Sequence, residues 1–286
     1  MGVRPRIPTA VVAAVVALAL LATGCGDEDS PTPSTTTGAP ATTRPSTTST
    51  TAVAASTTTV STTPTAVPTI VEDVLRGENE ADRYTYELKF PKLQGLADAA
   101  VQDAVNAGIR AEVTAAVDEF VAGAEELGAP APAVADQRSA LTGTYEVSRL
   151  DEGLASVRVR VSRFFAGAAH PGAVMLTFNH DLRTGARLTL TDLFTPGSPY
   201  LDKLSELSRQ LLAAQPGFAD VADFVQRGTG PTAENFAGWT LTDADLVITF
   251  AEYQVAPYAF GMPHVSIPFA SLRLLLDPDG PLAIRN

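Results

Sequence analysis

The sequence contains a long tract that cannot fold, and this tract determines where the folded domain can begin. From Gly26 to about Thr69 the chain is almost entirely Thr, Ser, Pro and Ala, with no aromatic residue and no hydrophobic periodicity. Such a segment cannot bury enough apolar surface to offset the entropy of ordering it. We therefore predict a disordered linker over residues 25–69 and one folded domain over residues 70–286.

The N-terminus predicts export. Arg4 and Arg6 precede an apolar run over residues 11–22, which is shorter than the about 20 residues of a membrane-spanning helix. A charged start, a short apolar run and small residues after it are typical of a signal peptide, here residues 1–24.

The residues that end the signal peptide indicate a lipid anchor. Ala22-Thr23-Gly24-Cys25 is similar to a lipobox, in which Cys25 would carry diacylglycerol and palmitate, although Ala22 stands where Leu is commonest. We expect a lipoprotein held to the cell membrane at its extracytoplasmic face. The alternative is cleavage at an ordinary signal-peptidase site, which would give a secreted protein.

Charge and cysteine content limit which bonds, metal sites and partners are expected for the domain. Cys25 is the only cysteine, so neither a disulfide nor a thiolate metal site is expected after it. The net charge is −12, and all of it lies after residue 69, because three acidic and three basic residues precede that point. This balance argues against nucleic acid as a partner and favours a cationic one, although solubility alone also explains it.

Hydrophobic patterning predicts an α+β domain. Tyr84–Phe90 alternates as a strand that Pro91 ends, and a long amphipathic helix follows from about Gln94 to Leu127, with Gly108 as a weak point and Gly128 as its stop. Further strands are expected at 141–148, 156–164, 173–179, 187–191, 246–250 and 264–267, and further helices at 198–214, 219–226 and 271–276. Short turns between consecutive strands predict an antiparallel sheet packed by the long helix and by shorter helices.

Several motifs resemble a known family. They are Ala-Gly-Ala-Ala-His-Pro at 166–171, Phe-Asn-His-Asp-Leu-Arg-Thr-Gly at 178–185, and Tyr-Gln-Val-Ala-Pro-Tyr-Ala-Phe-Gly at 253–261. Together they resemble the extracytoplasmic domain of the anti-sigma-V factor RsiV, which binds lysozyme. The same domain occurs in a secreted mycobacterial immunogenic antigen and beside the catalytic module of PdaC-type peptidoglycan deacetylases.

The resemblance extends over about Tyr84 to Leu276 and implies a β-grasp-like sheet domain, but no single activity. Only ten residues precede the apolar run, and little chain follows Leu276. We therefore expect neither direct sigma-factor regulation nor deacetylase chemistry.

No catalytic residues, metal or cofactor are expected. His170, His180 and His264 lack metal-ligand spacing, and there is no G-x-S-x-G motif. The carboxylate pairs Asp243/Asp245 and Asp277/Asp279 read as turns, because neither continues into a calcium-binding loop.

The strongest binding candidates are aromatic. Tyr253, Tyr258 and Phe260 are crowded together directly after a predicted strand, and rigidly held aromatics are frequent binding hot spots. The other interpretation is a lid that completes the core. His170, which precedes Pro171, is interpreted either as a turn residue or as part of a ligand site.

A basic stripe is the second candidate. Arg158 and Arg160 share one face of a predicted strand and could receive a carboxylate or an anionic glycan. The alternative is a solvated face on which Glu146 or Asp151 neutralises them.

Two functions follow, from different classes. The first is a non-enzymatic envelope lipoprotein whose domain binds an extracellular protein or cell-wall ligand, with a cationic lysozyme-like protein suggested by the resemblance. The second is an envelope enzyme acting on peptidoglycan or another glycan, with His170 and either Asp181 or Asp192 in its site. A structural or antigenic envelope protein is a third possibility.

Overall fold

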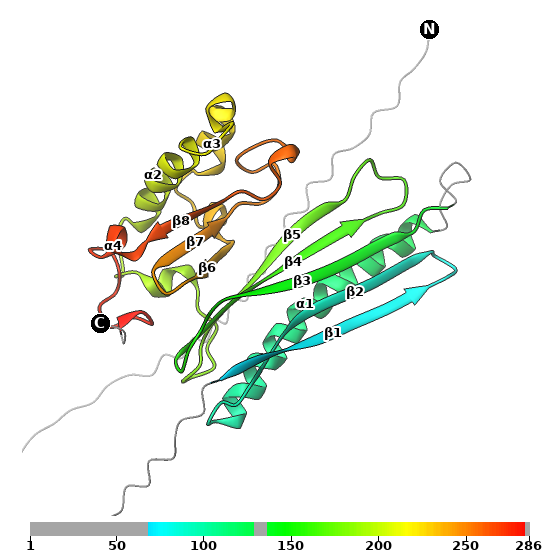
Figure 1. Ribbon diagram of the computed structural model, residues 1–286, viewed down its shortest axis with the longest axis horizontal. Helices are drawn as coiled ribbons and strands as arrows, with labels where there is room; N and C mark the ends of the chain where they lie inside the picture. Colours follow the sequence, from blue (N-terminus) through cyan, green and yellow to red (C-terminus); the bar gives the residue numbers. More distant parts are fainter. Residues whose placement is uncertain (1–67, 129–135, 284–286) are drawn as a thin grey trace, which may run out of the picture. The chain divides into compact units, whose positions relative to one another are not determined.

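The computed structural model describes residues 68–128 and 136–283, which form two β-sheets and several helices (Figure 1). The five-stranded sheet has the order β1-β2-β3-β4-β5, and the three-stranded sheet has the order β6-β7-β8. The predicted α+β class is confirmed. The predicted signal peptide, Cys25 and nearly all of the predicted linker lie outside the described residues. Among the helices of the described part, none combines the length and hydropathy needed to cross a membrane.

The strands and helices have the following bounds: β1 Thr69–Asn79, β2 Tyr84–Gln94, α1 Ala99–Leu127, β3 Ser139–Leu150, β4 Leu154–Phe164, β5 Gly172–Asp181, α2 Tyr200–Ala213, α3 Ala222–Gly228, β6 Trp239–Leu241, β7 Asp245–Thr249, β8 His264–Pro268 and α4 Phe269–Leu272. Short 3-10 helices cover Leu190–Leu193, Phe218–Val221, Ala233–Phe236 and Tyr258–Phe260.

Helix α1 packs along one face of the five-stranded sheet (Figure 1). The Asp98 carboxylate caps the helix by accepting from the backbone N–H groups of Ala100 and Val101, and Gly128 ends it with φ 64°. Its buried stripe recurs every three or four residues and consists of Val105, Ile109, Val113, Val117, Phe120 and Ala124. The predicted helix is confirmed, but it begins at Ala99, because Gln94 still belongs to β2, and Gly108 does not interrupt it.

The pairing of β2 corrects two predictions. Pro91 does not end the strand, because β2 continues to Gln94 and Pro91 lies opposite Glu72 of β1. Only Tyr84–Leu88 of β2 pairs with β3, so Pro91 lies where a missing N–H interrupts no central ladder. The β2–β3 pairing is parallel, since α1 carries the chain back across the sheet, whereas the other pairings are antiparallel.

The structure differs from the sequence-based prediction at three other segments. Strand β1 was not predicted. The predicted returning strand at 187–191 is reduced to one bridge between His180 and Arg187, and a 3-10 helix follows. The short strand β6 was also missed, and it creates a second sheet where only one was expected.

The second sheet has a separate apolar core. Leu204 and Leu212 of α2 and Leu246, Ile248 and Ile267 of the sheet are fully buried. They belong to one cluster, with partly buried leucines of α2 packed against it. The helix predicted at 198–214 is thus confirmed as α2.

Hydrogen bonds from buried polar groups join the two sheets. The Ser156 hydroxyl on β4 donates to the Asn179 side-chain carbonyl on β5 over 2.6 Å, and it accepts from the backbone N–H of Leu241 on β6 over 2.7 Å. The Asn179 amide donates to the carbonyl of Trp239 over 2.9 Å. Because Ser156 and Asn179 are at most 2% exposed, this junction sets how β6 sits against β4 and β5.

Candidate functional site

The segment after β7 separates its aromatic residues into two environments. Phe260 packs edge to face against Phe218, with ring centroids 5.0 Å apart, and adjoins the core of the second sheet. Tyr253 is 52% exposed, and Tyr258 is half-buried. Phe260 therefore matches the predicted lid, while the two tyrosines are available at the surface.

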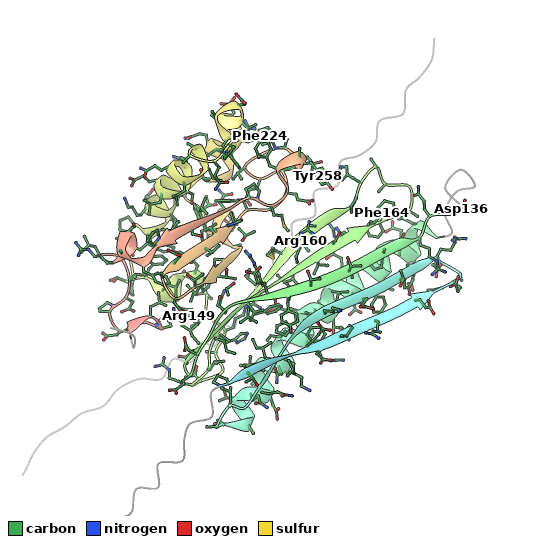
Figure 2. The ribbon with its side chains drawn as sticks, viewed as in Figure 1. Asp136, Arg149, Arg160, Phe164, Phe224 and Tyr258 are labelled. Carbon is green, nitrogen blue, oxygen red and sulfur yellow. The ribbon has the colours of Figure 1, made fainter. Side chains whose placement is uncertain are left out.

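The structure brings His170 to these tyrosines from the β4–β5 connection. The His170 and Tyr258 rings stack, with centroids 3.9 Å apart and an interplanar angle of 26°. The Tyr253 ring also stacks on Tyr258, with centroids 5.8 Å apart and an interplanar angle of 30°. We call His170, Tyr253 and Tyr258 the aromatic surface; Figure 2 labels Tyr258.

Hydrogen bonds orient these three rings. The Tyr258 hydroxyl donates to the carbonyl of Pro171 over 2.7 Å, and His170 Nδ1 lies 3.0 Å from the same oxygen. The Tyr253 hydroxyl lies 3.4 Å from His170 Nε2. A neutral imidazole with its proton on Nδ1 satisfies both contacts, because Nε2 then accepts from the tyrosine. The aromatic surface is therefore ordered by its own polar groups.

The backbone beneath the aromatic surface is held on both sides. Tyr253 has φ 64°, a left-handed conformation that costs a non-glycine residue about 1–2 kcal/mol. Next to it, the Gln254 amide donates to the carbonyls of Gly228 and Asn235, and the Glu252 carboxylate accepts from the N–H of Ala173. Strained residues persist where their surroundings over-determine them, and they cluster at functional sites. This strain is a signal that sequence patterning could not provide.

Arg158 and Arg160 lie on a different part of the surface. Both project from the face of β4 opposite its buried Val157, Val159 and Val161. The Arg158 guanidinium donates to the Glu146 carboxylate over 2.8 Å, which is one of the two partners considered from the sequence. Arg160 lines a cleft of about 290 Å³. Sequence reasoning missed that His264, Met175 and Met262 line the same cleft, because it depends on how the two sheets meet.

The candidate acidic residues Asp181 and Asp192 make contacts with residues other than His170. Asp181 pairs with Arg183 at 2.8 Å, and the Arg183 hydrogen bond lowers the pKa of that carboxyl. Asp192 accepts from the N–H and hydroxyl of Thr189. Neither carboxylate contacts His170. Across 68–128 and 136–283, no histidine bonds to a carboxylate or to a Ser or Thr hydroxyl, and no cluster of three or more acidic, His or Cys residues could hold a metal.

His180 predicts a measurable pH dependence of stability. It is 5% exposed, and burial lowers its pKa from the ordinary value of 6.5, opposed by the Gly185 carbonyl. The unfolded chain thus takes up a proton at a higher pH than the folded protein does, so the contribution is complete above about pH 6.5 and is lost as the pH falls below it. We expect stability to fall by at most about 1.4 kcal/mol per pH unit from this residue.

Urea denaturation at pH 7.5 and pH 5.5 tests this expectation. His180→Gln should reduce the loss of stability between the two pH values, whereas His264→Gln, at an exposed position, should keep it. Equal pH dependence in all three proteins would contradict the assignment.

Comparisons with known proteins agree with the α+β fold. Residues 191–270 match the family described as "Protein of unknown function (DUF3298)", a range that contains Tyr253, Tyr258 and His264. The chain therefore carries a DUF3298 domain. A crystal structure of a DUF3298 family member from Bacteroides fragilis NCTC 9343 has a TM-score of 0.51 at 17% identity, covering 74% of this chain and 95% of that one. This likeness supports the fold.

Two curated relatives have names that refer to enzymes. Esterase Rv3036c of Mycobacterium tuberculosis (strain ATCC 25618 / H37Rv) is 26% identical over 190 residues, which are 66% of this chain and 74% of that protein. The peptidoglycan-N-acetylmuramic acid deacetylase PdaC of Bacillus subtilis (strain 168) is 30% identical over 112 residues, 39% of this chain but only 24% of PdaC. The predicted relationship to PdaC is confirmed, and the specific likeness to RsiV stays a prediction.

Proposed function

We propose that this chain is a non-enzymatic, lipid-anchored binding protein of the cell envelope that captures a cationic, lysozyme-like protein through the aromatic surface. The observation that carries the proposal is the stack of His170, Tyr258 and Tyr253, which two segments far apart in sequence build at the surface. Aromatic rings held by their neighbours lose little entropy on binding and make effective anchors.

Charge supports a basic partner. The chain has a net charge of −12, which would speed the approach of a cationic protein. An arginine or lysine of that protein can then lie over an exposed tyrosine ring and gain a cation–π contact. The sequence resemblance to a lysozyme-binding domain points to the same class of partner.

Tyr258→Ala is expected to weaken binding of a cationic lysozyme about tenfold, or ~1.4 kcal/mol, at physiological salt. The change removes the ring that contacts both His170 and Tyr253. Titration calorimetry of the purified protein at low and physiological salt measures the effect.

Phe224→Ala is the matched control, because it removes a half-buried aromatic ring on α3 that is outside the aromatic surface. It should leave the affinity unchanged. Heat that salt abolishes, or equal affinities for the wild type and Tyr258→Ala, would refute the proposed role of this surface.

An envelope enzyme is the second candidate, favoured by the likeness to a protein named esterase over 74% of that protein's length. Turnover of a short-chain nitrophenyl ester separates the two functions. Hydrolysis that His170→Ala abolishes, with the fold intact, would favour the enzyme; no hydrolysis together with saturable lysozyme binding would favour the binding protein.

A further inference from the structure

A polar groove runs between the two sheets, and it is separate from the aromatic surface. Its first part is the cleft of about 290 Å³, in which Thr144, Arg160 and Met175 form one row across β3, β4 and β5. Thr249 and His264 of the second sheet pair with each other and also line this cleft. Figure 2 labels Arg160.

The groove continues beyond this cleft. A neighbouring hollow of about 230 Å³ shares Glu146, Arg158 and His264 with it and is also lined by Ser148 and Ser266. The first hollow alone, at about 290 Å³, is close to the lower end of small-molecule sites, which are typically about 300–1,000 Å³, and the two together exceed that lower end. The shared residues make them one elongated groove rather than two isolated depressions.

Arg160 is the charged group left open in this groove. Its neighbour Arg158 is neutralised by Glu146 at 2.8 Å. Arg163, on the same strand, is neutralised by Glu119 at 3.0 Å. In the part of the chain that the structure describes, Arg160 has neither an ion-pair partner nor a hydrogen-bond partner. An unpaired guanidinium presents a planar fork of donors that suits a carboxylate.

Hydroxyl groups complete the lining. Within residues 68–128 and 136–283, the side chains of Thr144, Ser148, Thr249 and Ser266 make no hydrogen bond, although all four residues line the groove. The imidazole of His264 is likewise without a partner there. Open hydroxyls at both ends of a groove, with one free cation between its walls, match a ligand that carries several hydroxyls and one negative charge.

We propose that this groove binds an acidic saccharide. The sugar carboxylate lies on Arg160, and the sugar hydroxyls bond to the Thr and Ser hydroxyls along the walls. Because the chain as a whole is negatively charged, long-range attraction does not draw such a ligand in, and directed hydrogen bonds must supply the affinity. This site goes beyond the proposed capture of a cationic protein, and it uses none of the aromatic-surface residues.

The test is an NMR titration of the purified protein with glucuronate, with glucose as the neutral counterpart. Glucuronate should bind saturably and shift the amide signals of residues 144, 160, 249 and 264, and glucose should bind at least tenfold more weakly. Arg160→Gln, which keeps the length but removes the charge, should weaken glucuronate binding about tenfold. Arg163→Gln is the matched control and should leave it unchanged.

A second experiment tests the other common source of a carboxylate, which is the C-terminus of a peptide. The dipeptide Ala-Ala is compared with its C-terminally amidated form. Binding of the dipeptide without binding of glucuronate would overturn the saccharide assignment, and binding of neither would overturn the site. Equal affinity for glucose, or glucuronate binding that Arg160→Gln leaves intact, would also overturn the proposal. Lysozyme binding by the same variants is measured in a separate titration. A negative result with glucuronate therefore leaves the proposed capture of lysozyme unaffected.

Discussion

Ser156→Ala is expected to lower the free energy of unfolding by about 2–4 kcal/mol, a large effect for the loss of one hydroxyl. Leu241 N–H and the Asn179 side-chain carbonyl would both lose their partner in a site that excludes water. Each buried polar group left unsatisfied costs about 1–3 kcal/mol. The variant should therefore loosen the attachment of the second sheet to the first.

Trp239 provides the measurement. It is the only tryptophan in the chain, it is buried, and its carbonyl accepts from Asn179 in the same network. Urea unfolding followed by its fluorescence reports directly on the junction. Ser162→Ala, on the same strand at a less buried position, is the control and should cost less than about 0.5 kcal/mol.

A double-mutant cycle with Asn179→Ala tests the network itself. Because the two side chains share a hydrogen bond, their effects should not add. If Ser156→Ala is as stable as Ser162→Ala, the buried network does not stabilise the junction.

Gly228→Ala is expected to destabilise the protein by about 1–3 kcal/mol and also to abolish lysozyme binding. A Cβ at position 228 would lie 2.0 Å from the carbonyl oxygen of Gln254 and 2.7 Å from its carbonyl carbon. These are backbone atoms, so no side-chain rotation relieves the clash. The segment that carries Tyr253 and Tyr258 would have to move away from α3, and the hydrogen bond from Gln254 to Gly228 would be lost.

Gly108→Ala is the matched control for this prediction. A Cβ there meets no atom within 4 Å, and the residue lies in the interior of α1. Alanine should therefore stabilise the protein by about 0.5–1 kcal/mol. Thermal unfolding and calorimetry with lysozyme measure both variants. A Gly228→Ala protein with wild-type melting temperature and wild-type affinity would show that the aromatic surface does not depend on this close contact.

The long helix and the second-sheet helices were predictable because their signals are local. The buried residues of α1 recur every three or four positions, and Gly128 supplies the left-handed residue that ends the helix. The helix predicted at 198–214 was recognised in the same way, and it forms as α2. These patterns depend on the spacing of residues within one element, and no distant partner is needed to recognise them.

The errors have a common cause in pairing between distant segments. Pro91 is compatible with β2 because β1 alone pairs with that part of the strand, and β1 follows a tract without any periodic pattern. The returning strand at 187–191 did not form, since only one bridge to β5 was made before the chain turned into a 3-10 helix. Neither outcome could be read from the segment itself.

The candidate site likewise has features that are local in the sequence and features that depend on contacts between distant segments. Residue type and crowding identified Tyr253, Tyr258, Phe260 and His170 separately, and the alternation along β4 placed Arg158 and Arg160 on one face. The sequence by itself determined the α+β class, the presence and C-terminal end of α1, the acidic charge and the list of aromatic candidates. Only the tertiary structure decided that His170 stacks on Tyr258, that Phe260 turns to the core, and that Arg160 stays open while Arg158 is paired. The physical reason is that these contacts join residues on different elements, and they exist only once two apolar cores and a buried polar junction have set where each loop lies.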